Sequence, residues 1–211
     1  MLQKVNNTIR SLVNDCFRRR INKRNRLRLR NRDITLIASN CNGCLMLHDL
    51  GLRFNSPFVN LFVEADDFIR LLQRFDYYMS KELEFAENTA ENYPVAYLED
   101  VKIHFVHYKT EDEAREKWVS RKARMNMDNC YILFTDRDGC TKRHLEQFDR
   151  LPFHNKVVFT NAAYADIPSA VFVRGFEQDA CVGNLHRYRG WNGLRYYDDF
   201  DYVAWFNGTD E

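Results

Sequence analysis

The 211-residue sequence has no apolar run that approaches the roughly 20 residues needed to span a bilayer. Its N-terminus also lacks the apolar block of a secretory signal. Glycine and proline are few, at 8 and 4 residues, which excludes collagen-like and low-complexity classes. With 45% hydrophobic residues, the composition is that of a globular protein, which we expect to stay in the cytoplasm.

Six cysteines are too sparse for a disulfide framework in a chain without a signal, so we expect reduced thiols. Cys41 and Cys44 form one CxxC motif, but no second such motif or histidine pair follows at zinc-site spacing. The sequence therefore predicts no structural zinc.

Acidic residues are nearly missing from the first 32 positions. This segment holds 11 Lys and Arg against Asp15 alone, which leaves 20 basic and 29 acidic residues in the rest of the chain. Its apolar residues recur at helical spacing and predict an amphipathic helix: Leu2, Val5, Ile9, Leu12, Val13, Cys16 and Phe17. We expect a basic helical arm over residues 1–32, with a basic connector from Arg18 to Arg32, and a single α/β domain over residues 33–211.

The arm has three possible roles. It can dock on its own domain and leave the connector solvated, or it can contact anionic lipid as a peripheral membrane segment. Nucleic acid is the weakest option, because no base-reading module accompanies the cations, so no specific nucleic-acid partner is predicted.

The region between residues 103 and 160 predicts strand, helix, strand, helix, strand. Strands are expected at 103–108, 129–135 and 156–160, with further strands at 33–39 and 170–174. Residues 52–63 predict an Asn-Ser-Pro turn that leads into a short strand, and a helix is expected at 66–83. This alternation indicates an α/β fold, a mostly parallel sheet flanked by helices. Ligands of such sheets bind beyond the carboxyl ends of the strands.

Cys41 follows the first predicted strand and lies near the start of a predicted helix. Helix N-termini stabilise a thiolate, so Cys41 is a candidate nucleophile. His104 and His107 are the candidate bases; on one strand they would face opposite sides, so at most one could serve Cys41. The alternative is that these residues are structural, as buried cysteines and hydrogen-bonded histidines often are.

Three cations share one face of the helix that Thr110 and Glu113 begin as a capping box: Lys117, Arg121 and Arg124. They could hold a phosphate or carboxylate, or they could form a solvated helix face.

Two carboxylates follow the strand 129–135. Asp136 and Asp138 could hold a divalent cation that neutralises a diphosphate, although a simple turn ending at Gly139 explains the same residues. Asn40 and Arg137 are further candidate ligand-binding residues beside these loops. The loop 183–193 contains Arg187, Arg189 and Trp191, which could contact a sugar or phosphate.

The chain resembles a bacterial family of unknown function whose members are commonly labelled exopolysaccharide biosynthesis proteins. The resemblance extends from Thr35 to Trp205 and is carried by Ser39-Asn40-Cys41 with Gly43, Asn55-Ser56-Pro57, Ile103-His104-Phe105 with His107-Tyr108, Lys117-Trp118 with Arg121 and Arg124, Arg137-Asp138-Gly139-Cys140, Phe148-Asp149 with Leu151-Pro152, and Lys156 with Phe159-Thr160. Cys44 departs from the second glycine that members often have there. A fainter similarity links the residue 39–41 loop and the residue 117–124 cations to papain-like cysteine hydrolases.

Three functions follow from these observations. The resemblance implies a role in exopolysaccharide or capsular polysaccharide synthesis, for which we expect a transferase that binds a sugar nucleotide or lipid-linked sugar. The second is a Cys/His hydrolase or acyltransferase that uses Cys41. The third is a non-catalytic partner of a polysaccharide assembly complex, held at the inner face of the membrane by residues 1–32.

Overall fold

Four parallel strands form the main sheet of the computed structural model, which describes residues 2–87 and 89–208, the side chains from residue 9 onward. The strands stand in the order β1-β5-β6-β7, with bounds Thr35–Ala38, Cys130–Thr135, Lys156–Thr160 and Ala170–Phe172. In the register of β1 and β5, Ile37 pairs with Ile132. The predicted α/β class with a mostly parallel sheet is confirmed, and the carboxyl ends of all four strands share one edge.

Helices cover both faces of this sheet, because successive strand residues point to opposite sides. Ile132 and Phe134 pack on one side with α3 (Ala65–Gln73), α4 (Phe75–Met79) and α6 (Lys142–Asp149). Tyr131 and Leu133 pack on the other side with α2 (Asn42–Leu50) and α7 (Tyr202–Phe206). A 3-10 turn, η2 (Tyr196–Asp199), precedes α7. The sheet is thus buried between two apolar layers.

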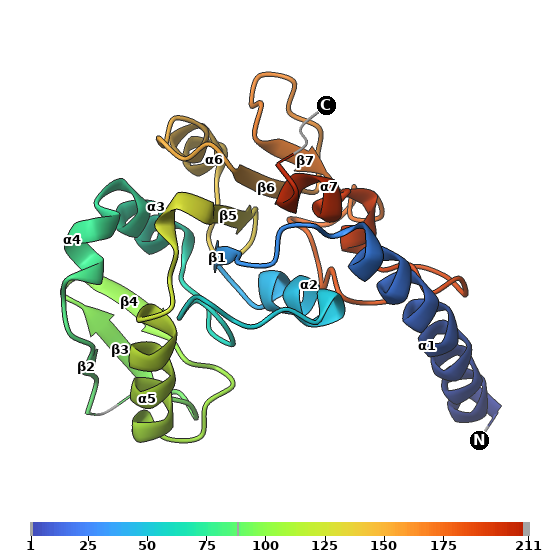
Figure 1. Ribbon diagram of the computed structural model, residues 1–211, viewed down its shortest axis with the longest axis horizontal. Helices are drawn as coiled ribbons and strands as arrows, with labels where there is room; N and C mark the ends of the chain where they lie inside the picture. The colour runs from blue at the N-terminus through green and yellow to red at the C-terminus, as the bar shows by residue number, and fades with distance from the viewer. Residues whose placement is uncertain (1, 88, 209–211) are drawn as a thin grey trace.

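A second, antiparallel sheet corrects one prediction. Its order is β2-β3-β4, with bounds Glu84–Phe85, Val95–Leu98 and Val101–His104. The strand expected at 103–108 belongs to this sheet and not to the main one, because a tight turn at Glu99 and Asp100 pairs it with the strand just before it. Figure 1 shows this sheet, with α5 (Glu111–Lys122), at the opposite end of the molecule from α1.

Two other elements differ from expectation. Residues 52–63 form a loop, in which Phe62 pairs with His104 of β4 through an isolated bridge. The helix expected at 66–83 breaks at Arg74, whose φ of −135° is not helical, and so divides into α3 and α4. The start of α5 is as predicted, since the Thr110 side chain accepts the Glu113 N–H, and a 3-10 turn, η1 (Met127–Asn129), leads into β5.

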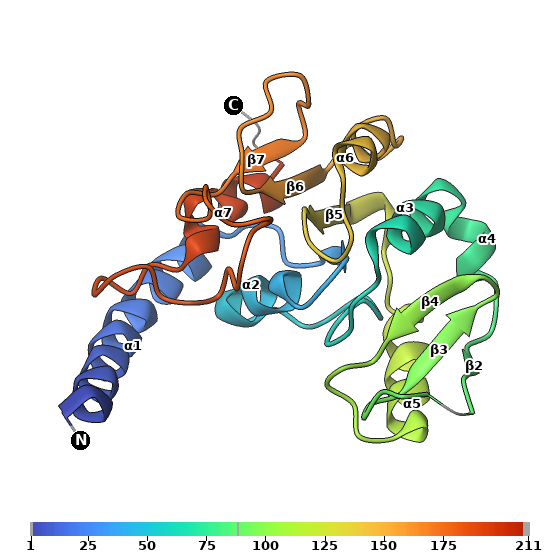
Figure 2. The ribbon, with the colours of Figure 1, turned by 180° about the vertical axis from the view of Figure 1, so that it is seen from behind.

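The N-terminal helix α1 (Leu2–Arg28) continues through the region expected to be a connector. Leu2 and Val5, which belong to the predicted apolar stripe, lie outside the described side chains. Figures 1 and 2 show the N-terminal end of α1 projecting away from both sheets. No described helix has the length and hydropathy required to cross a membrane.

Candidate functional site

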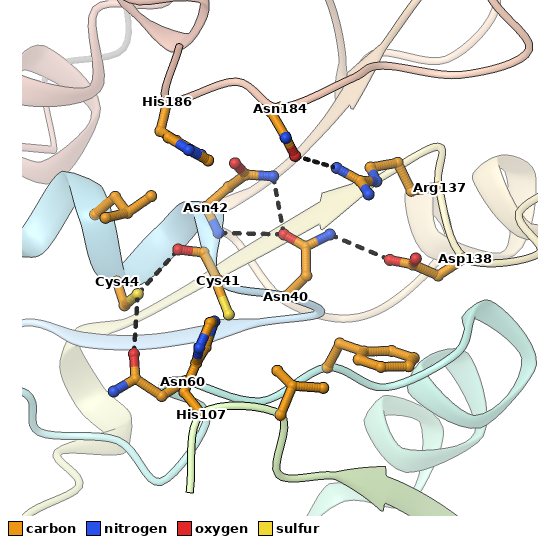
Figure 3. A pocket seen from close by; sticks show the side chains of 13 residues that line it. Asn40, Cys41, Asn42, Cys44, Asn60, His107, Arg137, Asp138, Asn184 and His186 are labelled. Carbon is orange, nitrogen blue, oxygen red and sulfur yellow. Dashed lines mark hydrogen bonds between the residues drawn. The ribbon is translucent and has the colours of Figure 1, made fainter. Parts of the chain in front are cut away.

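A hollow of about 720 Å³ opens at the carboxyl ends of β1 and β5. Its walls are the loop after β1 with the first turn of α2, the loop after β5, and three covering segments at residues 60–62, 106–107 and 184–186 (Figure 3). The lining residues are Asn40, Cys41, Asn42, Cys44, Leu45, Asn60, Phe62, Val106, His107, Arg137, Asp138, Asn184 and His186. Five residues predicted from the sequence therefore meet here: Asn40, Cys41, His107, Arg137 and Asp138.

Cys41 occupies the N-cap position of α2 and is partly buried. Its Sγ lies 3.7 Å from the Leu61 carbonyl oxygen, while the Cys44 Sγ lies 2.9 Å from the Cys41 carbonyl oxygen. A hydrogen bond shared with Cys44, together with burial, raises the pKa of Cys41. That hydrogen bond with Cys41 lowers the pKa of Cys44, and the positive charge of Arg121 lowers it further. Cys41 therefore keeps its proton at neutral pH and needs a base to become a nucleophile.

Two histidines from different segments face this hollow. His107 follows β4 and lies on the side toward which the Cys41 thiol points in Figure 3, while His186 reaches in from the loop 183–193. Burial, with the charges of Arg195 and Arg187, lowers the pKa of His186. His186 is therefore neutral at pH 7 and able to accept a proton.

His104 does not line the hollow. Its side chain is buried, stacks on Phe62 with ring centroids 4.2 Å apart, and places Nδ1 3.3 Å from the Tyr93 hydroxyl. Because β4 ends at His104, His107 lies beyond the strand, and the expectation that the two histidines alternate on one strand was wrong. Of the two candidate bases, only His107 shares a cavity with Cys41.

An amide network holds the loops after β1 and β5 together. The Asn40 Nδ2 donates to the Thr135 hydroxyl at 2.7 Å and to the Asp138 carboxylate at 3.4 Å. The Asn40 Oδ1 accepts from the backbone N–H of Asn42 at 3.2 Å and from its Nδ2 at 3.0 Å. Asp138 takes a left-handed backbone conformation, with φ of 55°, as asparagine and aspartate tolerate. Asn40 therefore links the thiol loop to the carboxylate loop.

Asp136 and Arg137 precede Asp138 in the same loop but have different partners. The Arg137 Nη1 donates to the Gly183 carbonyl oxygen at 3.2 Å and to Asn184 at 3.3 Å, which ties the covering loop to the site. Asp136 accepts the backbone N–H groups of Asn161 and Val182, each at 2.7 Å, and burial raises its pKa. Asp136 is thus absent from the cavity lining and supports two loops, while Asp138 faces the hollow. Among the described residues, 2–87 and 89–208, no three or more His, Cys, Asp or Glu side chains are grouped so that they could hold a metal ion.

The three predicted cations, Lys117 and Arg121 on α5 and Arg124 just after it, are also separate from the cavity lining. Arg121 donates to the Tyr108 hydroxyl at 2.5 Å, and Arg124 donates to the Ser120 and Phe54 carbonyl oxygens at 2.7 and 2.9 Å. Lys117 pairs with Glu116 at 2.8 Å. The structure does not bring these cations together as a clamp with Asp136 and Asp138, although Arg121 is near enough to act on Cys44.

Sequence reasoning missed five polar residues of the site: Asn42, Cys44, Asn60, Asn184 and His186. The CxxC spacing was a usable signal for Cys44, because positions three apart at a helix start lie on one face. The loop 183–193 was recognised as a possible contact, but its arginines and Trp191 were chosen in place of Asn184 and His186. Asn60 carried no signal, since only the tertiary fold brings its Oδ1 to 3.6 Å from the Cys44 Sγ.

The chain matches the family described as Domain of unknown function (DUF1919) over residues 12–207, and it belongs to that family. It is also 48% identical over 199 residues to an uncharacterized protein of Haemophilus influenzae (strain ATCC 51907 / DSM 11121 / KW20 / Rd). That alignment covers 94% of this chain and 96% of the relative. The family and the site together define the molecule as an α/β protein with two thiols, two histidines and a carboxylate around one hollow.

Proposed function

We propose that this protein is a thiol-dependent acyl-transfer enzyme, either a hydrolase or an acyltransferase, with Cys41 as its nucleophile and His107 as its general base. The observation that supports the proposal is that both side chains line the same 720 Å³ hollow. A thiol that retains its proton at neutral pH requires a neighbouring base, which His107 supplies.

In the proposed reaction, His107 takes the proton of the Cys41 thiol while the sulfur attacks the carbonyl carbon of an ester. The ester C–O bond breaks, His107 returns the proton to the departing alkoxide oxygen, and the acyl group remains on Cys41 as a thioester. Water or a second hydroxyl then attacks the thioester and loses its proton to His107. The acyl group leaves with the new oxygen, and the proton returns to the Cys41 sulfur.

The substrate we propose is a hydroxyl-rich molecule of the sugar class. Four amide side chains line the hollow: Asn40, Asn42, Asn60 and Asn184. The Asn40 amide is engaged by Thr135, Asp138 and Asn42, so Asn42, Asn60 and Asn184 are the amides we expect to contact the substrate. An amide carries both a donor and an acceptor, which suits hydroxyl groups. The family resemblance to exopolysaccharide biosynthesis proteins favours the same class, with a surface polysaccharide or its precursor as the acyl donor or acceptor.

A transferase of phosphorylated sugars is the second candidate, because Arg137 places a cation in the same hollow. Its donor would be a sugar nucleotide or a lipid-linked sugar, with or without a divalent cation. Calorimetry with sugar nucleotides and Mg²⁺ separates the two candidates: saturable binding that Arg137→Gln abolishes and Cys41→Ser leaves intact would favour the transferase.

The thiol proposal is tested by alkylation with iodoacetamide, followed residue by residue by mass spectrometry. We expect His107→Gln to slow the alkylation of Cys41 at pH 7 about tenfold or more, as loss of a general base does, and to leave the rate of exposed Cys16 unchanged. His48→Gln is the matched control, because His48 is an exposed histidine on α2. The proposal fails if His107→Gln leaves the alkylation rate of Cys41 unchanged, or if His48→Gln slows Cys41 as much as His107→Gln does.

A further inference from the structure

Helix α1 docks on the body through its polar side. Asn14, Arg18 and Asn25 are buried, at 1%, 3% and 5% exposure. The Asn14 side chain donates to the Gly190 carbonyl oxygen and accepts from the Gly193 N–H, both at 2.9 Å, and Asn25 donates to the Tyr202 hydroxyl at 3.1 Å. This is the reverse of an ordinary amphipathic helix, which packs its apolar side against its own domain.

The apolar side of α1 is therefore left in water. Its exposed residues, which we call the α1 stripe, are Ile9 at 49%, Leu12 at 65%, Phe17 at 42% and Leu27 at 80% exposure. Trp191, at 48% exposure, lies beside the same helix, with the Arg10 guanidinium over its ring at 5.9 Å from the centroid. Large apolar side chains gathered on one projecting helix indicate a surface that another apolar phase covers.

Cations surround the stripe. Arg19, Arg20, Lys23 and Arg24 are all exposed, and Asp15 is the single acidic residue between residues 2 and 28. A second hollow, of about 440 Å³, lies along the helix and is lined by Arg19, Asn22, Lys23, Arg26, Leu27 and Arg32. Four cations beside one leucine match an anionic headgroup attached to an acyl chain.

We infer that the α1 stripe, with Trp191, is a docking surface for an anionic lipid bilayer, on which the helix lies without crossing it. A second copy of this chain fits less well, because it would bring two strongly basic helices together. A nucleic acid would pair with the cations but would leave the stripe in water. Tryptophan beside cations is also typical of the membrane interface. The inference does not depend on the reaction proposed for Cys41.

Co-sedimentation of the full chain with vesicles tests the inference. We expect the wild type to sediment with phosphatidylglycerol/phosphatidylcholine vesicles at low salt and to stay in the supernatant when the vesicles are pure phosphatidylcholine. Leu12→Glu with Leu27→Glu should weaken binding by more than about tenfold, because both side chains would lose their apolar contact with lipid. A variant with Arg19, Arg20, Lys23 and Arg24 all replaced by Gln should also lose binding. Val119→Glu is the matched control, because Val119 is a 61% exposed apolar residue on α5.

Circular dichroism checks that each variant keeps its fold. The inference is overturned if the wild type stays in the supernatant with anionic vesicles, or if the double leucine variant binds as well as the wild type. A third outcome also overturns it: the wild type and the double leucine variant both fail to bind vesicles, and the wild type is a dimer while the variant is a monomer. The α1 stripe would then be a contact between two copies of the chain. Binding to single-stranded nucleic acid that the four Gln changes abolish, without any vesicle binding, would overturn it as well.

Discussion

At the residue scale, burial decides what a histidine can do. His104 and His107 are three positions apart, yet His104 is 3% exposed beneath Phe62 while His107 is exposed and faces the hollow. Burial lowers the pKa of His104, with a further contribution from Lys102, because a charged ring would lose its hydration there. His104 is therefore a neutral packing residue.

This lowered pKa makes part of the stability depend on pH. Above the ordinary histidine pKa of about 6.5, His104 is neutral in both the folded and the unfolded chain, and the full contribution of the buried ring to the free energy of unfolding is present. As the pH falls below about 6.5, the unfolded chain takes up a proton that the folded chain resists. The free energy of unfolding therefore decreases as the pH falls, until the pH reaches the lowered pKa that His104 has in the folded chain. We expect His104→Gln to flatten the fall in unfolding free energy between about pH 7.5 and pH 5.5, measured by urea denaturation.

His107→Gln is the matched control, because it removes an exposed histidine three positions away and leaves the buried His104 ring in place. Equal slopes for wild type and His104→Gln would show that His104 does not titrate as its burial requires.

At the element scale, the position of Cys41 depends on how closely α2 approaches β1. Gly43 lies in the first turn of α2, where a Cβ atom would stand 2.8 Å from the Ala38 Cβ and 2.9 Å from the Leu36 Cδ2. The φ of Gly43 is not positive, so close packing is the reason for glycine at this position. This contact fixes the start of α2, and with it the thiol.

Gly43→Ala should therefore destabilise the protein despite the better helix propensity of alanine. Overpacking costs about 1–3 kcal/mol, which exceeds the propensity gain of up to about 1 kcal/mol. Urea denaturation measures the difference. Gly190→Ala is the control, since its Cβ would meet nothing closer than 3.8 Å and should be nearly neutral. A stabilised Gly43→Ala variant would mean that α2 can move away from β1 without cost.

The elements that the sequence predicted well are those with local signals. Capping by Thr110 and the apolar runs at 129–135 and 156–160 depend on neighbours in the chain. Strand pairing does not, so Ile103 was expected in the wrong sheet. The meeting of Cys41 with Asp138 was predictable because their strands are parallel neighbours, whereas Asn60 and His186 come from covering loops that no local pattern locates.

At the scale of the whole molecule, the basic arm and the body share one buried cluster. Arg18 donates to Asp49 at 2.6 Å and to Asp198 at 2.6 Å, and its Nη2 lies 3.1 Å from the Tyr197 hydroxyl. Burial alone would raise the pKa of Asp49, but the Tyr197 hydrogen bond and the charge of Arg18 lower it overall. Residues 2–28 are thus joined to residues 49 and 198 by charges that have little access to water.

Arg18→Met should therefore destabilise the entire chain and not the arm alone. Removing one partner of a buried ion pair costs about 3–5 kcal/mol, because Asp49 and Asp198 would stay buried without their cation.

Arg28→Met is the control on the same helix: Arg28 and Asp201 form an exposed pair, which contributes about 0–1 kcal/mol. Urea unfolding followed by helix circular dichroism and by tryptophan fluorescence, to which buried Trp118 and Trp205 contribute, should give one shared transition that Arg18→Met shifts and Arg28→Met does not. If the helix signal were lost first and alone, residues 1–32 would be a separate unit, and Arg18 would not couple the arm to the sheet.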